Sequence, residues 1–135
     1  MKSIFFTIFL VTFCGISLSQ NSPSRTSVSL CITNEIKQSD NVFLISKSSL
    51  KNIEKIELCE QGKKTEAYKV IAYDVMGKIQ GKFTEWTGKG ENLSEGAKNL
   101  LKNMDLDSKI AFKITFRNIL TQKDEELEIV IKTIN

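Results

Sequence analysis

The chain has 135 residues, a net charge of +3 and 41% hydrophobic residues, which is typical of one small globular domain. Basic and acidic residues alternate without a basic tract, so neither nucleic acid nor an anionic membrane surface is indicated as a partner. The chain contains no histidine, which removes the usual partner of a serine or cysteine nucleophile and most zinc-site chemistry. We therefore expect no cofactor, no metal site and no catalytic residues.

The first 19 residues have the pattern of a cleavable signal peptide. A positive start precedes residues 4–13, an apolar run of about ten residues that is too short to span a bilayer. Ser17 and Ser19 supply the small residues of a cleavage site, so we expect cleavage after Ser19 and a periplasmic or secreted mature chain. Lipid modification of Cys14 is the alternative, but the bulky residue before it disfavours that site.

The mature chain is expected to contain one domain. Residues 20–26 are polar and include the only proline, so they predict a disordered segment between the cleavage site and the fold. Residues 27–135 are enough for a single core and too few for two.

Two cysteines, Cys31 and Cys59, remain after cleavage, and both lie in apolar segments. An oxidising compartment lets them form a disulfide if their Cα atoms lie within about 7 Å. Free cysteines are also common as buried apolar residues, so inert core thiols are the alternative. The sequence leaves both open.

Alternation of apolar and polar residues predicts the early strands. Residues 27–33 and 53–58 show this period of two, and residues 42–45 form a short apolar run. Residues 68–76 form the longest candidate, with apolar residues on both faces, which favours a central position in a sheet. Residues 61–64 predict a turn before it.

The segment that follows is predicted as a loop. The glycines of Gly77–Gly81 indicate a tight connection, and Gly88–Gly90 close the loop without the glycine spacing of a phosphate-binding motif. Phe83 and Trp86 lie between them. Trp86 is either an exposed contact residue or a lid on the core, and we carry Phe83 and Trp86 forward as candidate partner-binding residues.

A helix is predicted next, over residues 93–104. Its apolar residues fall at helical spacing on one stripe, with Ser94 as the N-cap and Glu95 at the positive end of the helix dipole. Gly96 weakens the helix by about 1 kcal/mol relative to alanine, so packing against a sheet must hold it in place. The stripe consists of Leu93, Ala97, Leu100, Leu101 and Met104.

The C-terminal residues predict an antiparallel hairpin. Residues 110–116 and 127–131 both alternate, with residues 121–125 as the turn between them. Lys113 and Arg117 are expected to face Glu126 and Glu128 across its solvent side. Taken together, the elements predict a mainly β, α+β fold, an antiparallel and sandwich-like sheet with one short helix packed on it.

The order of these elements resembles the C-terminal domain of GldM, a gliding-motility protein of the type IX secretion machinery of Bacteroidota. The resemblance is carried by the strand Tyr68–Val75, the Gly81–Phe83 step, the helix Glu95–Asn103 and the strand Lys109–Ile114. Residues 45–52 also look like the family's Ser-Lys-x-x-Leu segment near the start of that domain. The similarity covers nearly the whole mature chain.

This resemblance implies an extracytoplasmic, mainly β module without enzymatic activity that meets other envelope components. The chain leaves room for the terminal module only, so we expect a free-standing exported relative without the family's membrane helix. The turn at Asn118–Asp124 departs from the family pattern, and no partner contact there is carried over.

Three functions are weighed. The first is a non-catalytic adaptor that binds another envelope or secreted protein. The second is a secreted hydrolase, for which Glu125, Glu126 and Glu128 are the only paired carboxylates, although the last two project from a predicted solvent face. The third is a small-ligand carrier, which needs an enclosed apolar cavity. We expect the adaptor.

Overall fold

In a computed structural model of the chain, the described residues are 28–31, 36–39 and 42–134, with residues 36–39 described by their backbone alone. The predicted signal peptide and its cleavage site, the alternative lipidation of Cys14 and the predicted disordered segment all lie outside these residues. They stay predictions.

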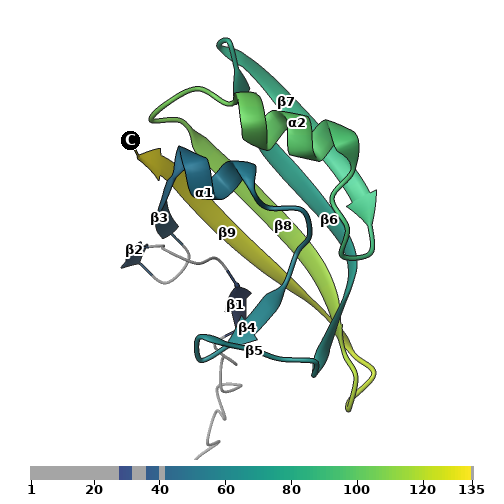
Figure 1. The fold of residues 1–135 in the computed structure, drawn as a ribbon. Coiled ribbons are helices and arrows are strands. Elements are labelled where there is room, and N and C mark those ends of the chain that lie inside the picture. Colours follow the sequence, from purple (N-terminus) through teal and green to yellow (C-terminus); the bar gives the residue numbers. More distant parts are fainter. Residues whose placement is uncertain (1–27, 32–35, 40–41, 135) are drawn as a thin grey trace, which may run out of the picture.

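The described residues form nine strands and two helices (Figure 1). The helices are α1 (Lys47–Lys51) and α2 (Glu95–Asn103). The strands are β1 (Val28–Leu30), β2 (Ile36–Ser39), β3 (Val42–Ser46), β4 (Leu58–Glu60), β5 (Lys63–Lys64), β6 (Tyr68–Ile79), β7 (Lys82–Lys89), β8 (Lys109–Asn118) and β9 (Asp124–Ile134). The predicted mainly β fold is therefore confirmed.

Six strands make one large sheet, in the order β2-β3-β9-β8-β6-β7. Every neighbouring pair is antiparallel except β3 and β9, which run parallel with Val42 opposite Val130. The sheet is thus mixed rather than purely antiparallel. The predicted hairpin is confirmed in β8 and β9, which pair from Lys109 opposite Lys132 to Arg117 opposite Asp124.

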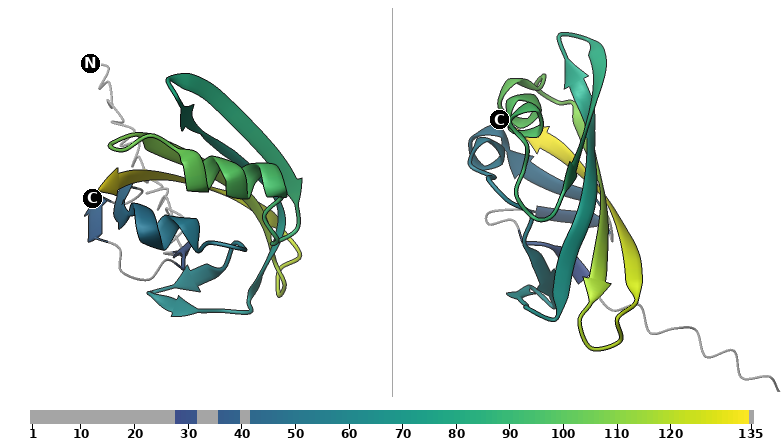
Figure 2. Two further views of the ribbon diagram at one scale, coloured as in Figure 1. Left: turned by 45° about the horizontal axis from the view of Figure 1, so that its top comes forward. Right: turned by 90° about the vertical axis from the view of Figure 1, so that its right-hand side faces the viewer.

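Both helices and the second, smaller sheet (β1-β4-β5) lie on the same side of the large sheet, which Figure 2 shows with the large sheet seen edge-on. We call this side the covered face and the other side the open face. Aliphatic and aromatic residues of the covered face, the helices and the small sheet make one hydrophobic cluster. Its largest fully buried side chains include Tyr73, Phe112, Leu100, Leu101 and Ile131.

Helix α2 forms as predicted. The Ser94 hydroxyl accepts the N–H of Ala97 at 3.2 Å, which satisfies one of the N–H groups that a helix start leaves without an intrahelical partner. Ala97, Leu100 and Leu101 are buried against the sheet. In addition, the Tyr73 hydroxyl accepts the Ser94 N–H at 2.6 Å and donates to the Asn92 carbonyl at 3.2 Å, which ties the start of α2 to the middle of β6.

A second short helix, α1, was not predicted. Ser46–Ser49 looks like a break in the strand pattern, yet the Ser46 hydroxyl accepts the Ser49 N–H at 3.2 Å and caps a helix of five residues. Leu50 of this helix is fully buried in the core. A polar cap followed by one anchoring leucine is enough here because tertiary packing, not length, holds so short a helix.

The predicted loop over Gly77–Gly90 is wrong except for the tight connection expected within Gly77–Gly81, which the structure has at Gln80–Gly81. Strand β6 continues to Ile79, and β7 returns antiparallel beside it after the two-residue turn Gln80–Gly81. Both turn residues have positive φ (50° and 74°), the geometry of a type I′ hairpin turn. Asp105 holds this turn, because its two carboxylate oxygens accept the N–H groups of Gln80 (3.0 Å) and Gly81 (3.1 Å).

The predicted strand 53–58 is also largely wrong. Only Leu58 belongs to a strand, whereas Lys55 makes a single bridge to Asn92. The Ile56 N–H donates to the Glu91 carbonyl at 2.8 Å, and the Leu93 N–H donates to the Glu54 carbonyl at 3.1 Å. Ile56 and Leu58 are both buried in the hydrophobic cluster, but only Leu58 lies in a strand.

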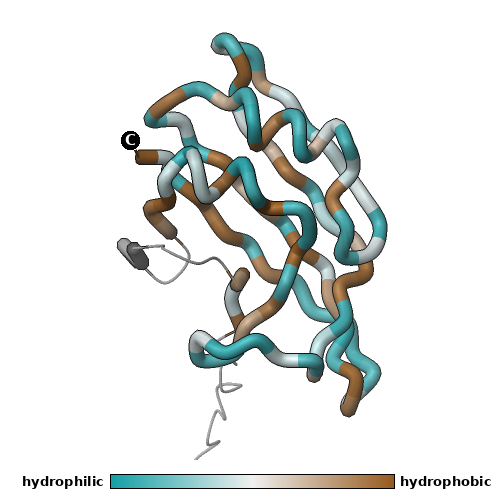
Figure 3. The backbone as a smooth tube through the Cα atoms, in the orientation of Figure 1, coloured by the Kyte–Doolittle hydropathy of each residue, from teal (hydrophilic) through white to brown (hydrophobic). Residues whose placement is uncertain are grey.

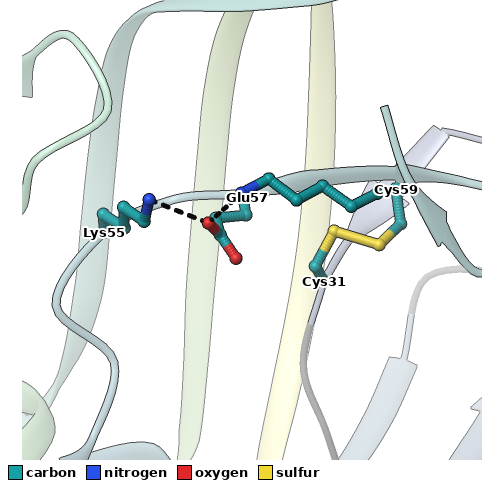
Figure 4. Close-up of a disulfide and its surroundings, with 5 residues drawn as sticks. Cys31, Lys55, Glu57 and Cys59 are labelled. Atoms are coloured by element: carbon teal, nitrogen blue, oxygen red, sulfur yellow. Dashed lines mark hydrogen bonds and ion pairs between the residues drawn. A yellow bond between two sulfur atoms is a disulfide. The ribbon is translucent and has the colours of Figure 1, made fainter. Parts of the chain in front are cut away.

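A disulfide between Cys31 and Cys59 ties β1 to β4, and their Cα atoms lie 5.1 Å apart (Figure 4). Close by, the Glu57 carboxylate receives Lys64 at 2.7 Å and Lys55 at 2.9 Å. Leu30 and Leu58, on β1 and β4, are buried in the hydrophobic cluster. The disulfide thus cross-links two strands of the small sheet, which packs on one end of the covered face.

Candidate functional site

The two candidate partner-binding residues, Phe83 and Trp86, lie on opposite faces of β7. Trp86 is paired with the buried Val75 and therefore points to the covered face, whereas Phe83 is paired with Lys78 and points to the open face. Trp86 is 42% exposed and Phe83 is 66% exposed. The structure does not bring them together into one patch.

Trp86 packs on α2. A side chain added at Gly96 would overlap the indole ring, so the glycine that weakens the helix also makes room for the tryptophan. The sequence leaves open whether Trp86 is an exposed contact residue or a lid on the core. The structure combines the two, because one side of the ring lies on the helix and the other side is exposed.

The open face carries an apolar row that crosses four strands. Pairing between strands places Val42 beside Val130, Val130 beside Ala111 and Ala111 beside Met76. We call these four residues the apolar row, and each is half-buried. The alternating brown and teal along the strands in Figure 3 follows this placement of apolar and polar residues on the two faces.

An open hollow of about 590 Å³ lies at the β7 end of this row. Met76, Ala111 and Val130 form its apolar floor, and Phe83 projects at its edge. Lys78 and Lys109 stand at its rim, with Asp107 and Ser108 from the loop that follows α2. An exposed aromatic beside an apolar hollow with a charged rim is typical of a contact surface.

The rim belongs to a row of like charges. Lys109 lies directly opposite Lys132 on β9, and Lys78 lies on the same face of β6, two residues beyond Met76. We call Lys78, Lys109 and Lys132 the lysine row. Like charges directly opposite each other destabilise a sheet, and no carboxylate of the described residues lies within ion-pair distance of these three ammonium groups.

The Lys109–Lys132 pair also has the closest type of cross-strand spacing. The Thr133 N–H donates to the Ser108 carbonyl at 3.3 Å, so the next pair along the ladder is of the non-hydrogen-bonded kind, in which side chains approach most closely. The open face therefore holds concentrated positive charge beside an apolar floor.

The three carboxylates considered for a hydrolase do not converge. Glu126 and Glu128 lie on the open face of β9, and Glu126 is paired with Lys113 at 3.4 Å. Glu125 alternates to the other face and is opposite Phe116. The predicted charge pairing is confirmed for Lys113, which lies opposite Glu128 and pairs with Glu126, and is wrong for Arg117, which binds Asp124 at 2.6 Å.

The shifted pKa values have ordinary ion-pair causes. The pKa of Glu57 is lowered chiefly by a hydrogen bond from Lys64 and next by one from Lys55. The pKa of Lys98 is raised chiefly by its hydrogen bond to Glu54. A lowered pKa for a carboxylate and a raised pKa for an ammonium group both favour the charged form near neutral pH. The shifts therefore point to structural ion pairs rather than to a general acid or base.

Among residues 28–31, 36–39 and 42–134, no three or more His, Cys, Asp or Glu side chains are grouped so that they could hold a metal ion. None of the helices in this part of the chain has the length and apolar character needed to cross a membrane.

Sequence reasoning missed the hollow, because its residues come from four strands and the loop after α2. A local signal did exist for β7: Gln80–Gly81 stands between the long strand pattern of β6 and a stretch rich in aromatic residues and threonine, which favours a two-residue hairpin. Recognising that turn would have placed Phe83 opposite Lys78 and separated it from Trp86.

Comparisons with protein-family models, with curated proteins and with solved structures find no match to this chain. The likeness to the GldM C-terminal domain therefore stays a resemblance of element order.

Proposed function

We propose that this protein is a non-catalytic protein-interaction module whose contact surface is the hollow on the open face. The observation that carries the proposal is the combination, around one hollow, of an apolar floor, an exposed Phe83 and two lysines, Lys78 and Lys109, that form no ion pair within the described residues. Interaction sites commonly have an apolar centre with a polar rim.

The charge on the rim favours an acidic partner, because two lysines, Lys78 and Lys109, stand there against one carboxylate, Asp107. Lys78, Lys109 and Lys132 repel one another on the isolated chain, and a partner that brings carboxylates would remove that repulsion. The fitting occupant is an acidic segment of another protein with an apolar side chain that enters the hollow beside Phe83.

We also propose that the protein acts outside the cytoplasm. The Cys31–Cys59 disulfide supports this, because disulfides persist in oxidising compartments and are rare in reducing ones. The predicted signal peptide leads to the same compartment. A role in gliding motility or type IX secretion rests on the resemblance to GldM alone.

The alternatives receive less support. A hydrolase would need carboxylates that converge in a cleft, and Glu125, Glu126 and Glu128 diverge. A small-ligand carrier would need an enclosed cavity, and the hollow is an open depression of the sheet surface.

The experiment compares two alanine-to-aspartate variants on the same face. Ala111→Asp places a negative charge in the floor of the hollow, whereas Ala72→Asp places the same charge on the open face outside it. Immobilised wild-type protein and both variants are incubated with envelope and secreted fractions, and the bound proteins are quantified by mass spectrometry. We expect one or more proteins to be captured by the wild type and by Ala72→Asp and to be lost with Ala111→Asp.

A synthetic peptide carrying the acidic segment of a captured protein should then compete with that protein for the wild type. Equal capture by the two variants, when both unfold like the wild type, would exclude the hollow as the contact surface. Turnover of any substrate by the purified protein would exclude the non-catalytic assignment.

A further inference from the structure

Strand β7 has one hydrogen-bonding edge that no described residue occupies. It pairs with β6 alone and is the last strand of the large sheet, as Figure 1 shows. The Gly90 N–H donates to the Ile71 carbonyl at 2.8 Å, so the even-numbered residues of this segment bond to β6. The odd-numbered residues therefore direct their N–H and C=O groups outward: Phe83, Glu85, Thr87 and Lys89.

An edge strand of eight residues is long enough to add another strand. The odd-numbered residues also place their side chains on the open face. Along the strand these are the aromatic Phe83, the negative Glu85, the hydroxyl of Thr87 and the positive Lys89. Within the described residues, neither Glu85 nor Lys89 is in an ion pair. The charges are therefore available to a strand that approaches the edge.

We propose that β7 of a second copy of this chain occupies the edge, antiparallel and with Thr87 of the two copies on the two-fold axis. In this register Glu85 of each copy lies directly opposite Lys89 of the other, so the pairing gives two ion pairs across the axis. The outward N–H and C=O groups of these residues then bond to each other as hydrogen-bonded pairs.

Neighbouring registers are disfavoured by charge. Centring the axis on Glu85 or on Lys89 places identical charges opposite each other. Centring it on Gly88 leaves Glu85 opposite no residue of β7, which ends at Lys89, so no ion pair forms. A shift toward the N-terminus sets Glu85 against Thr87 and makes no ion pair. The Thr87-centred register is the one in which every charge of this edge meets its opposite.

On the covered face the same register sets Trp86 of one copy opposite Gly88 of the other. The Tyr73 ring of each copy already fills the space over its own Gly88, and Trp86 packs on α2 of its own copy, so the ion pairs on the open face carry the register. The pairing joins two large sheets into one and leaves both hollows on the same continuous face.

The first test measures self-association of the purified protein by sedimentation over a range of concentrations. We expect a monomer–dimer equilibrium in the wild type. Glu85→Lys should weaken dimerisation by roughly tenfold or more, because both ion pairs become repulsions. The double change Glu85→Lys with Lys89→Glu should restore it, because the opposite charges face each other again.

A wild type that stays monomeric at every concentration would overturn the proposal. A dimer that Glu85→Lys leaves unchanged, or that the double change fails to restore, would overturn it equally.

The second test locates the axis by cross-linking. With Thr87→Cys, two copies of the new cysteine face each other across a hydrogen-bonded pair, where Cα atoms are about 5.5 Å apart and within disulfide reach. The matched control is Thr84→Cys, which lies on the same strand and bonds toward β6. We expect Thr87→Cys to give a covalent dimer on oxidation, beyond any seen with the wild type. Equal cross-linking of both variants would overturn the register.

Discussion

The two faces of the large sheet are built from the same strands and have opposite properties. On β8, Ile110, Phe112 and Ile114 are at most 1% exposed, whereas the residues between them point to the open face and are partly exposed. Two helices and a small sheet cover the first face, and no described residue covers the hollow on the second. One alternating sequence thus supplies both the core that keeps the protein folded and the open face on which we propose that a partner binds.

The largest expected effect comes from removing a core aromatic. Phe112→Ala deletes a side chain that is 1% exposed, which should lower the free energy of unfolding by about 4 kcal/mol. Thr115→Ala, on the open face of the same strand, is the matched control and should change it by less than about 0.5 kcal/mol. Denaturant unfolding measures both. Similar losses of unfolding free energy in the two variants would contradict the view that only the covered face holds the core.

The second effect concerns the covalent closure of the covered face. The Cys31–Cys59 disulfide joins residues 28 positions apart, so replacing both cysteines with serine should lower the free energy of unfolding by about 3 kcal/mol. Thermal unfolding with and without a reductant measures the effect. The wild type should lose stability in the reductant and the double variant should not. A wild type whose stability is unchanged after complete reduction would show that the disulfide does not stabilise the small sheet.

The third effect tests the contact between β7 and α2. Gly96→Ala normally stabilises a helix by about 1 kcal/mol, but here the added methyl overlaps the Trp86 ring and should destabilise the protein by about 1–2 kcal/mol. The double change Gly96→Ala with Trp86→Ala should recover the helix gain, since the overlap is gone. Trp86→Ala alone should leave capture through the hollow unchanged.

Trp86 is the only tryptophan in the chain, so its fluorescence reports the packing of the indole directly. A red-shifted emission in Gly96→Ala would accompany displacement of the ring. Stabilisation by Gly96→Ala alone would show that Trp86 does not pack on the helix.

The smallest effect is the pH dependence of the ion pairs beside the disulfide. The lowered pKa of Glu57 in the folded state means that its contribution to stability is fully present above its ordinary pKa of about 4.5 and is lost as the pH falls through the lower, folded value. Thermal midpoints of the wild type and of Glu57→Gln should therefore differ at neutral pH and converge in acid. A difference that widened as the pH fell would have the wrong sign for this pair.

Much of the covered face was predictable from the sequence. The inward-facing positions of β8 and β9 are apolar at every second residue over 110–116 and 127–131, and the helix α2 has a serine cap and a complete apolar stripe, so local pattern and tertiary burial agree. Where they agree, residue spacing alone specifies the element and its buried side.

The edge of the sheet was not predictable in the same way. On β7 the covered side carries Thr84, Trp86 and Gly88, because α2 and Tyr73 occupy the space that larger side chains would fill. The strand therefore shows no apolar period of two, and its glycines look like loop residues. The hollow depends on β6, β7, β8 and β9 becoming neighbours in that sheet, and no local pattern encodes the choice of β6 and β8 as neighbours.

Asp105 fixes the tip of the β6–β7 hairpin, which should speed the pairing of another strand with the β7 edge. Its carboxylate holds the N–H groups of Gln80 and Gly81, and its own N–H donates to the Lys78 carbonyl at 3.3 Å, so the tip of the hairpin is fixed to the loop after α2. The backbone of β7 has thus lost its conformational freedom during folding, before any encounter with a second molecule. The β7 of a second copy is fixed in the same way, so pairing at this edge should proceed at the rate of productive collisions rather than wait for a rearrangement of either sheet.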